Sequence, residues 1–164
     1  MNKLWLHLDK KLKRDPKHFI LQTVLAFLAL AIILSQIRFL GRGVLVAALG
    51  SSMFIAFLTP ASYTARSWNL IGSHIISALI GIGFYYLICQ FPANQIAFIL
   101  LSAASVALSM FTMVVTNTEH PPAAGTSLGF ALDGNWISFL FISVSVIALA
   151  IIKRLLRPWL QDLV

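Results

Sequence analysis

Hydrophobic residues along this chain gather in six runs, separated by short polar or broken stretches. Four runs can cross a lipid bilayer as helices, since a crossing needs about 20 mostly apolar residues. They are predicted over about residues 19–37, 69–90, 95–115 and 136–152. Two shorter runs, Val44–Leu58 and Pro122–Leu132, lie between them. The pattern predicts an all-α membrane protein with four long transmembrane helices and two short helical segments, each a half-helix or re-entrant.

The order of these segments repeats along the chain. Residues 19–90 and residues 95–153 each give a long, a short and a long run, and both short runs are rich in Gly, Ser and Ala. Paired interrupted segments at matching positions indicate a transporter site at the interface of two repeats. Three crossings per half make the repeats inverted, whereas re-entrant short segments leave four crossings. Arg66 is cytoplasmic with six crossings and external with four, so the positive-inside rule favours six.

The start of the chain differs from the rest. Residues 1–17 are basic, with Leu4, Leu8 and Leu12 at helical spacing, which predicts a short helix attracted to anionic headgroups on the membrane surface. A secretory signal is not expected, because the following apolar run continues past Ala29-Leu30-Ala31, where a cleavage site would fall. Residues 18–164 are predicted to form a single transmembrane domain.

Composition and charge support this reading and add an orientation. Hydrophobic residues make up 59% of the chain and charged residues 10%, and the mean hydropathy is +0.90. The net charge of +7 comes from the ends, where nine of the twelve Lys and Arg residues lie. In a membrane protein this indicates cytoplasmic termini in a bacterial inner membrane rather than nucleic-acid binding. The single cysteine, Cys89, excludes an internal disulfide.

The most unusual polar stretch is Thr116–Gly129, which leads into the second short segment. His120 and Pro121 each precede a proline, which predicts extended backbone at both, and Pro122 suits the first turn of a helix. A helix over Pro122–Leu132 spans about 16 Å, roughly half a bilayer crossing. Its positive N-terminal end would then lie inside or near the membrane. This stretch is the predicted functional centre; the alternative is a plain extramembrane loop.

Four ionisable residues are assigned roles around this helix start. We expect His74 to face His120 across the repeat interface as a polar gate for a small anion or its conjugate acid; the alternative is two buried structural histidines. The ordinary pKa of histidine lies near 6.5, so His120 can switch charge near physiological pH. Glu119 is expected to hold the fold, by capping the half-helix or pairing with Arg66 or a histidine. Arg66 either attracts anions at the mouth or anchors the topology.

Small polar residues supply the other candidates. Ser51, Ser52, Thr126 and Ser127 can hydrogen-bond an anion while leaving the path neutral, or they serve close packing. Five hydroxyl residues recur every three or four positions on one helical face: Ser102, Ser105, Ser109, Thr112 and Thr116. That stripe predicts either a pore wall or a packing seam.

Several of these residues resemble the motifs of a known family. The run Glu119-His120-Pro121-Pro122, followed by Ala-Ala-Gly-Thr, resembles the signature of the HPP family of small integral membrane proteins. Leu49–Met53 with Pro60, and Asn69–His74, are similar to two further motifs of that family, and the resemblance covers about residues 15–155. The sequence departs in having Ser67-Trp68 where the family commonly has Pro-Arg. Gly125 also comes one residue later than the family's glycine.

The resemblance implies a function as well as a fold. Family members are described with four transmembrane helices and are associated with nitrite transport in plastids and cyanobacteria. The residues within the matching motifs complete the predicted substrate-binding set, which is His120, Pro121, Pro122, Gly125, Thr126, Ser51, Ser52, Asn69 and His74.

The sequence therefore predicts a transporter or channel for a small inorganic anion, with nitrite the implied substrate. The expected partners are that anion and membrane lipid, with a homo-oligomer left open and no nucleic acid. No cofactor and no metal are expected, and the protein is not expected to be an enzyme. One alternative is an accessory or scaffold subunit. Another is an intramembrane metalloenzyme using Glu119, His120 and His74, although the chain lacks an H-E-x-x-H motif. The anion, the direction of transport and the choice between channel and proton-coupled carrier stay open.

Overall fold

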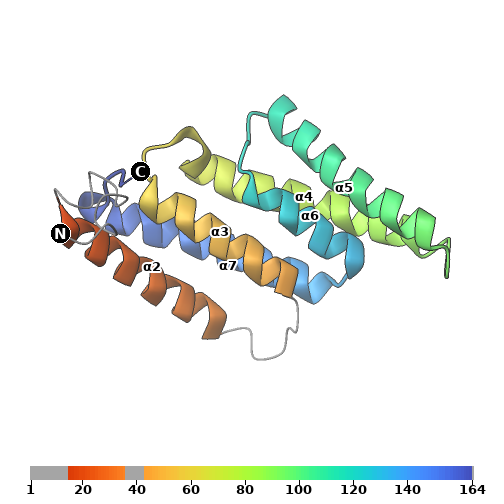
Figure 1. Ribbon diagram of the computed structural model, residues 1–164, viewed down its shortest axis with the longest axis horizontal. Helices are drawn as coiled ribbons and strands as arrows, with labels where there is room; N and C mark the ends of the chain where they lie inside the picture. Colours follow the sequence, from red (N-terminus) through yellow and green to blue (C-terminus); the bar gives the residue numbers. More distant parts are fainter. Residues whose placement is uncertain (1–14, 36–42, 164) are drawn as a thin grey trace, which may run out of the picture.

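The computed structural model describes residues 15–35 and 43–163, and every regular element in these ranges is helical (Figure 1). The predicted surface segment, residues 1–17, lies outside the described residues except for its last three. The elements are α2 (Pro16–Ser35), α3 (Gly43–Leu58), η2 (Tyr63–Ala65), α4 (Ser67–Ile88), α5 (Gln95–Val115), α6 (Pro122–Leu132), α7 (Trp136–Leu156) and η3 (Arg157–Trp159). Four of them are long and apolar enough to cross a membrane, and α3 and α6 are shorter. The predicted fold class is confirmed.

Local chemistry explains where the helices begin and end. The side chains of Asn94 and Asn135 cap α5 and α7 by accepting the N–H groups of Ala97 and Ile137, which satisfies donors that the first helical turn leaves free. α7 runs four residues past the predicted end at 152, through Lys153 and Arg154. Cations in a last turn interact favourably with the helix dipole. The hydrophobic run therefore ends before the helix does.

The six helices run along the long axis of the molecule and alternate in direction (Figure 1). The start of α2, the end of α3, the start of α4 and the end of α7 meet at one end. Leu163 N–H donates to Leu58 O (2.9 Å) and Ala61 N–H donates to Asp162 Oδ1 (3.0 Å) there. We call this the basic end. The described Lys and Arg residues all belong to it: Lys17, Arg66, Lys153, Arg154 and Arg157.

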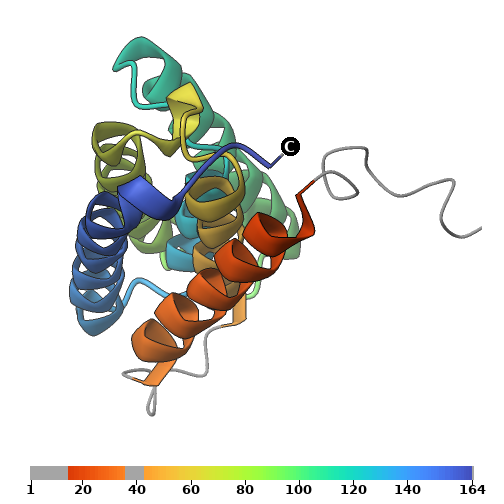
Figure 2. The same ribbon diagram turned by 90° about the vertical axis from the view of Figure 1, so that its left-hand side faces the viewer.

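The short helix α6 is surrounded by other helices. It packs against α3, α4 and α5, so the two short segments meet, as predicted. At the edges, α2 contacts α3 and α7, whereas α5 contacts α4 and α6; Figure 2 shows α2 and α5 on opposite sides of the bundle. If α2, α3 and α4 are matched with α5, α6 and α7 in order, the contacts of α2 with α3 and α7 correspond to the contacts of α5 with α6 and α4. This correspondence is what an inverted repeat of 19–90 and 95–153 requires, and the repeat stays a prediction.

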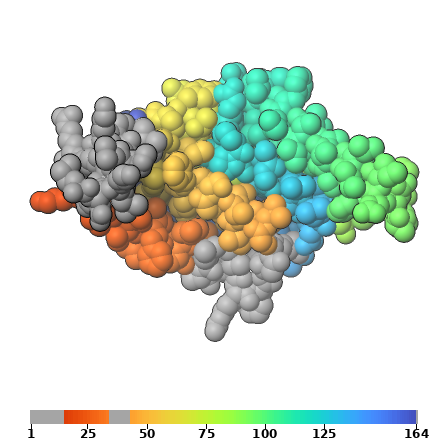
Figure 3. Space-filling model, in the orientation of Figure 1, coloured from red at the N-terminus to blue at the C-terminus, as the bar shows by residue number. Residues whose placement is uncertain are grey.

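The outer surface is apolar. Phe27 and Ile32 on α2, Phe111 on α5 and Ile137 on α7 are more than 60% exposed, and in water such a surface would not persist on a monomer. One face of α3 also lies open between α2 and α6 (Figure 3). We expect lipid tails to contact these faces.

We propose that the basic end faces the cytoplasm, because cytoplasmic ends carry the excess of Lys and Arg. A reporter enzyme that works only outside the cytoplasm is therefore expected to be silent when fused after Val164. The same reporter fused after Gly134, at the opposite end between α6 and α7, is expected to be active. The reverse pattern of activities would overturn this orientation.

Candidate functional site

A continuous chain of hydrogen bonds lies in the interior where α3, α4 and α6 meet. His120 Nδ1–H donates to the carbonyl oxygen of Thr64 (2.7 Å), and His120 Nε2 lies 2.9 Å from Ser52 Oγ. Ser52 Oγ lies 2.9 Å from His74 Nε2, and His74 Nδ1 lies 2.7 Å from Thr126 Oγ1. Both histidines, Ser52 and Thr126 are fully buried. Together with Thr64 these four residues form what we call the histidine chain.

The sequence brings these groups together through small residues on the facing helices. A Cβ added at Gly81 of α4 would lie 2.4 Å from the main-chain oxygen of Ser127 in α6. One added at Gly129 of α6 would lie 2.6 Å from a methyl group of Leu45 in α3. Glycines therefore let α6 approach both α4 and α3 closely. The two imidazole rings lie with their centroids 5.4 Å apart, so the predicted pairing of His74 with His120 is confirmed as geometry.

Counting donors and acceptors shows what protonation state the histidine chain favours. Ser52 Oγ has one proton, yet it also donates to the carbonyl oxygen of Ala48 (2.9 Å). Neutral His120 has its proton on Nδ1, facing Thr64, so its Nε2 is an acceptor that competes with Ala48 for the Ser52 proton. If His120 carries a second proton, Nε2–H donates to Ser52 Oγ and every contact is satisfied. The hydrogen bonds are therefore complete with one extra proton.

Burial and charge oppose that extra proton. His120 lies in the connection between α5 and α6, outside the four membrane-spanning helices. Burial and, to a lesser extent, the nearby Lys153 ammonium together lower the pKa of His120 to about 4, against the raising effect of its hydrogen bond to Thr64. The expected charge switch near pH 6.5 is thus moved to lower pH. An anion beside His120 would offset this cost by charge attraction.

The backbone around the two prolines differs from the expectation. Pro121 has φ −50° and ψ −37°, which is helical rather than extended. The N–H groups of Ala123 and Ala124 donate to the carbonyls of His120 and Pro121, and these turn bonds wind the chain one residue before α6 begins. The prediction of extended backbone at Pro121 is therefore wrong, because turn hydrogen bonds outweigh the preference of a residue that precedes proline.

Glu119 acts through its main chain. Its carbonyl oxygen accepts a hydrogen bond from Asn69 Nδ2 (3.2 Å), which ties the start of α4 to the segment that carries His120. No side chain caps α6, and within residues 15–35 and 43–163 the structure records no ion pair of the Glu119 carboxylate. Arg66 is exposed, and its guanidinium lies 4.8 Å from the centre of the Tyr63 ring.

The hydroxyl stripe on α5 is divided between two environments. Ser102, Ser105 and Ser109 are buried; Ser109 pairs with Ser77 of α4 (2.6 Å) and the carbonyl of Ser105 accepts from Ser127 of α6 (3.0 Å). This part of the stripe joins α5 to its two neighbours. Thr112 and Thr116 lie outside the buried core and bond to the carbonyls of their own helix, at Leu108 and Thr112.

The remaining candidates lie beside the histidine chain rather than in it. Ser51 is exposed, and its Oγ donates to Ala47 O (3.0 Å). It lines an open groove with Pro121 and Pro122. Gly125 faces Ala48 of α3, where an added Cβ would lie 3.6 Å from the alanine methyl group.

Two contacts around His120 and η2 were not predicted from the sequence. Thr64 accepts from His120, and Lys153 Nζ donates to the neighbouring carbonyl of Ala65. Both contacts use main-chain oxygens of η2, for which the sequence carries no side-chain signal.

A comparison with family models decides where the chain belongs. The model described as "HPP, transmembrane region" matches residues 11–157. This chain belongs to the HPP family. The His-Pro-Pro motif of this HPP protein is His120-Pro121-Pro122, and its histidine is the one that links η2 to Ser52.

One curated relative of this HPP protein is a transmembrane protein of Dictyostelium discoideum. It is 33% identical over 114 residues, which is 68% of this chain and 39% of the relative. The chain thus matches about two fifths of the length of that relative. No solved structure matches the HPP chain. Among the residues described here, no group of three His, Cys, Asp or Glu side chains is placed to hold a metal ion.

Proposed function

We propose that this HPP family membrane protein is a transporter or channel for a small inorganic anion, with nitrite the substrate that the family resemblance implies. One observation carries the proposal. Two histidines, a serine and a threonine are fully buried and hydrogen-bonded in one chain, among helices whose outer faces are apolar.

The energetics favour a functional reading of these residues. Polar and ionisable groups are costly inside a membrane domain, and such groups mark substrate or proton pathways. His120 also precedes the N-terminal end of α6, where helix N–H groups and the helix dipole favour negative charge. The cations of the basic end add a positive potential that attracts anions to this side.

The protonation argument suggests how an anion is handled. Burial and Lys153 oppose the extra proton on His120. An anion brings the missing negative charge, and the proton completes the hydrogen bonds of Ser52. Anion and proton are therefore expected to bind together and to leave together, which makes the transported pair electrically neutral. On this basis the protein is a proton-coupled carrier rather than an open channel.

Flux into liposomes containing the purified protein tests the proposal. Nitrite, nitrate, formate, bicarbonate and chloride are offered one at a time at a fixed inward pH gradient. We expect saturable uptake of at least nitrite, and a loss of most uptake in Ser52→Ala, which disconnects the two histidines. Ser73→Ala is the matched control, because Ser73 is equally buried and donates to Leu70 of its own helix. Absence of flux for all five anions in folded protein would leave the accessory-subunit alternative.

A further inference from the structure

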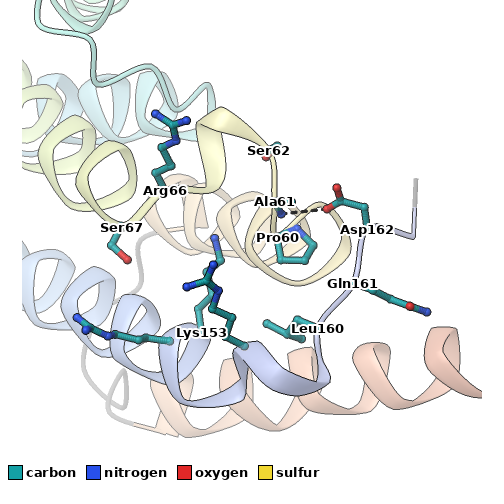
Figure 4. Close-up of a pocket in the computed structure, with 11 residues that line it drawn as sticks. Pro60, Ala61, Ser62, Arg66, Ser67, Lys153, Leu160, Gln161 and Asp162 are labelled. Atoms are coloured by element: carbon teal, nitrogen blue, oxygen red, sulfur yellow. Dashed lines mark hydrogen bonds between the residues drawn. The ribbon is translucent and has the colours of Figure 1, made fainter.

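A second feature of the basic end is a pocket separate from the histidine chain. It lies between the connection from α3 to α4 and the end of α7 with the residues that follow, and its volume is about 580 Å³. Figure 4 shows the connection on one side, with Pro60, Ser62 and Arg66, and Lys153 and Leu160 on the other. The pocket has walls from two segments that are far apart in the sequence.

The charges that line this pocket are unbalanced. Arg66, Lys153, Arg154 and Arg157 supply four cations, and Asp162 is the acid among the lining residues. Asp162 Oδ1 already accepts the N–H of Ala61 (3.0 Å). Within the described part of the chain, the structure records no salt bridge for any of the four cations. The pocket therefore has an excess of positive charge and guanidinium donors without acidic partners.

The volume of the pocket exceeds what a three-atom inorganic anion would fill, so the pocket has room for a larger group around any anion that it binds. A water molecule occupies roughly 30 Å³ in the liquid, and a three-atom anion is of the same order. A volume of about 580 Å³ instead falls in the range of sites for larger ligands. Arginine binds phosphate through two parallel hydrogen bonds, and the pocket presents three arginines with the hydroxyl-bearing Ser62 and Ser67.

The position of the pocket points to the level of lipid headgroups. Trp68, next to Ser67, is 70% exposed, and Trp159, close to Arg157, is 56% exposed. Exposed tryptophans gather where a membrane protein passes from lipid tails to water. Basic pockets at the ends of membrane helices bind anionic headgroups. The positive charge of the pocket, its volume and its level at the membrane surface all favour a ligand that carries a phosphate group.

We propose that this pocket binds a phosphoryl group, presented by an anionic phospholipid headgroup or by a soluble phosphate. Arg154 and Arg157 bind the phosphate oxygens from the end of α7, and the Arg66 guanidinium, which lies against the Tyr63 ring, turns toward them from the other wall when the phosphate binds. The glycerol or other substituent of the phosphate occupies the remaining volume beside Pro60 and Leu160. The proposed site uses none of the residues of the histidine chain, although its cations also belong to the basic end.

Calorimetric titration of the purified protein in a neutral detergent tests this site. The probes are a short-chain phosphatidic acid, phosphatidylcholine with the same chains, and inorganic phosphate. Binding of phosphatidic acid but not of inorganic phosphate identifies a lipid site, and binding of both with similar affinity identifies a free-phosphate site. Either result supports the proposal if it depends on the arginines. Failure of both to bind overturns it.

Arg154→Gln, Arg157→Gln and Arg66→Gln are each expected to weaken binding about tenfold, the loss of one charge-assisted hydrogen bond. Lys17→Gln is the matched control, because Lys17 is a cation of the same end that does not line the pocket. Equal weakening by Lys17→Gln would indicate general charge attraction and overturn the proposal. If a variant fails to fold, a salt titration of the unaltered protein decides, because a phosphate gripped by several cations must lose affinity steeply as salt rises.

Discussion

Gly81→Ala is expected to lower the melting temperature of the purified protein more than any other single added methyl group described here. A Cβ at Gly81 would lie 2.4 Å from the main-chain oxygen of Ser127 and 2.7 Å from Cβ of Phe130. Both atoms are fixed by the α6 backbone, so α4 and α6 must move apart. Forcing a methyl group into a packed core costs roughly 1–3 kcal/mol. The displacement would also separate His74 from Thr126, so anion flux should fall with stability.

Gly83→Ala provides the matched control two residues further along α4. A Cβ at Gly83 meets nothing within 4 Å, and alanine favours a helix over glycine by about 1 kcal/mol. This variant should be as stable as the parent or slightly more stable, by thermal unfolding in detergent. If both variants melt at the same temperature, the close contact of α4 with α6 is not what holds the bundle together.

His120→Gln is expected to leave the protein folded and to remove most anion flux. Glutamine keeps an N–H donor for nearby groups, whereas His120→Ala would leave Thr64 O without its imidazole donor next to a cavity. Losing a charge-assisted hydrogen bond costs about 1.5–3 kcal/mol, or 10- to 100-fold in rate. The flux of the parent should rise as pH falls from 8 to 5.5, because a proton binds with the anion. The variant has no titrating group at that position, so its flux should be nearly flat.

Nitrite uptake into liposomes over this pH range, with proton movement followed in parallel, provides the measurement. His18→Gln is the control, since His18 lies near the start of α2 and pairs with Asp15. Should His120→Gln transport nitrite like the parent at every pH, the histidine has a structural role. Nitrite uptake without accompanying proton movement would support the transporter proposal and contradict the proposed proton coupling.

Much of the fold follows from local sequence signals. α5 and α6 have the predicted bounds, Gln95–Val115 and Pro122–Leu132, because asparagine caps one and proline begins the other. α4 (Ser67–Ile88) begins and ends two residues before the predicted range 69–90, and α7 ends four residues past its predicted end at 152. Apolar periodicity does not register where a helix continues through polar residues. The helical turn at Pro121 depends on hydrogen bonds from residues that follow it, which a rule about neighbouring residues cannot include.

The side chains of the candidate site could be predicted from the sequence, but the hydrogen bonds that join them could not. His74, His120, Ser52 and Thr126 are conspicuous as polar residues within apolar runs. The central position of Ser52 depends on contacts across 22 and 68 residues, which only the packing of three helices creates. The main-chain partner at Thr64 has no side-chain signal. The predicted roles of these residues in transport await the flux measurements.

The buried amide of Gln22 has a consequence for how the protein is made. Its Nε2–H groups donate to the carbonyls of Phe57 and Gln161, and Gln161 follows it by 139 residues. At roughly 5–20 residues per second, the ribosome takes about 7–28 s to deliver that second partner. The contact with Phe57, only 35 residues after Gln22, can form much earlier. The contact of α2 with the C-terminal residues must therefore be a late step of biogenesis, whereas its docking onto α3 need not wait for them.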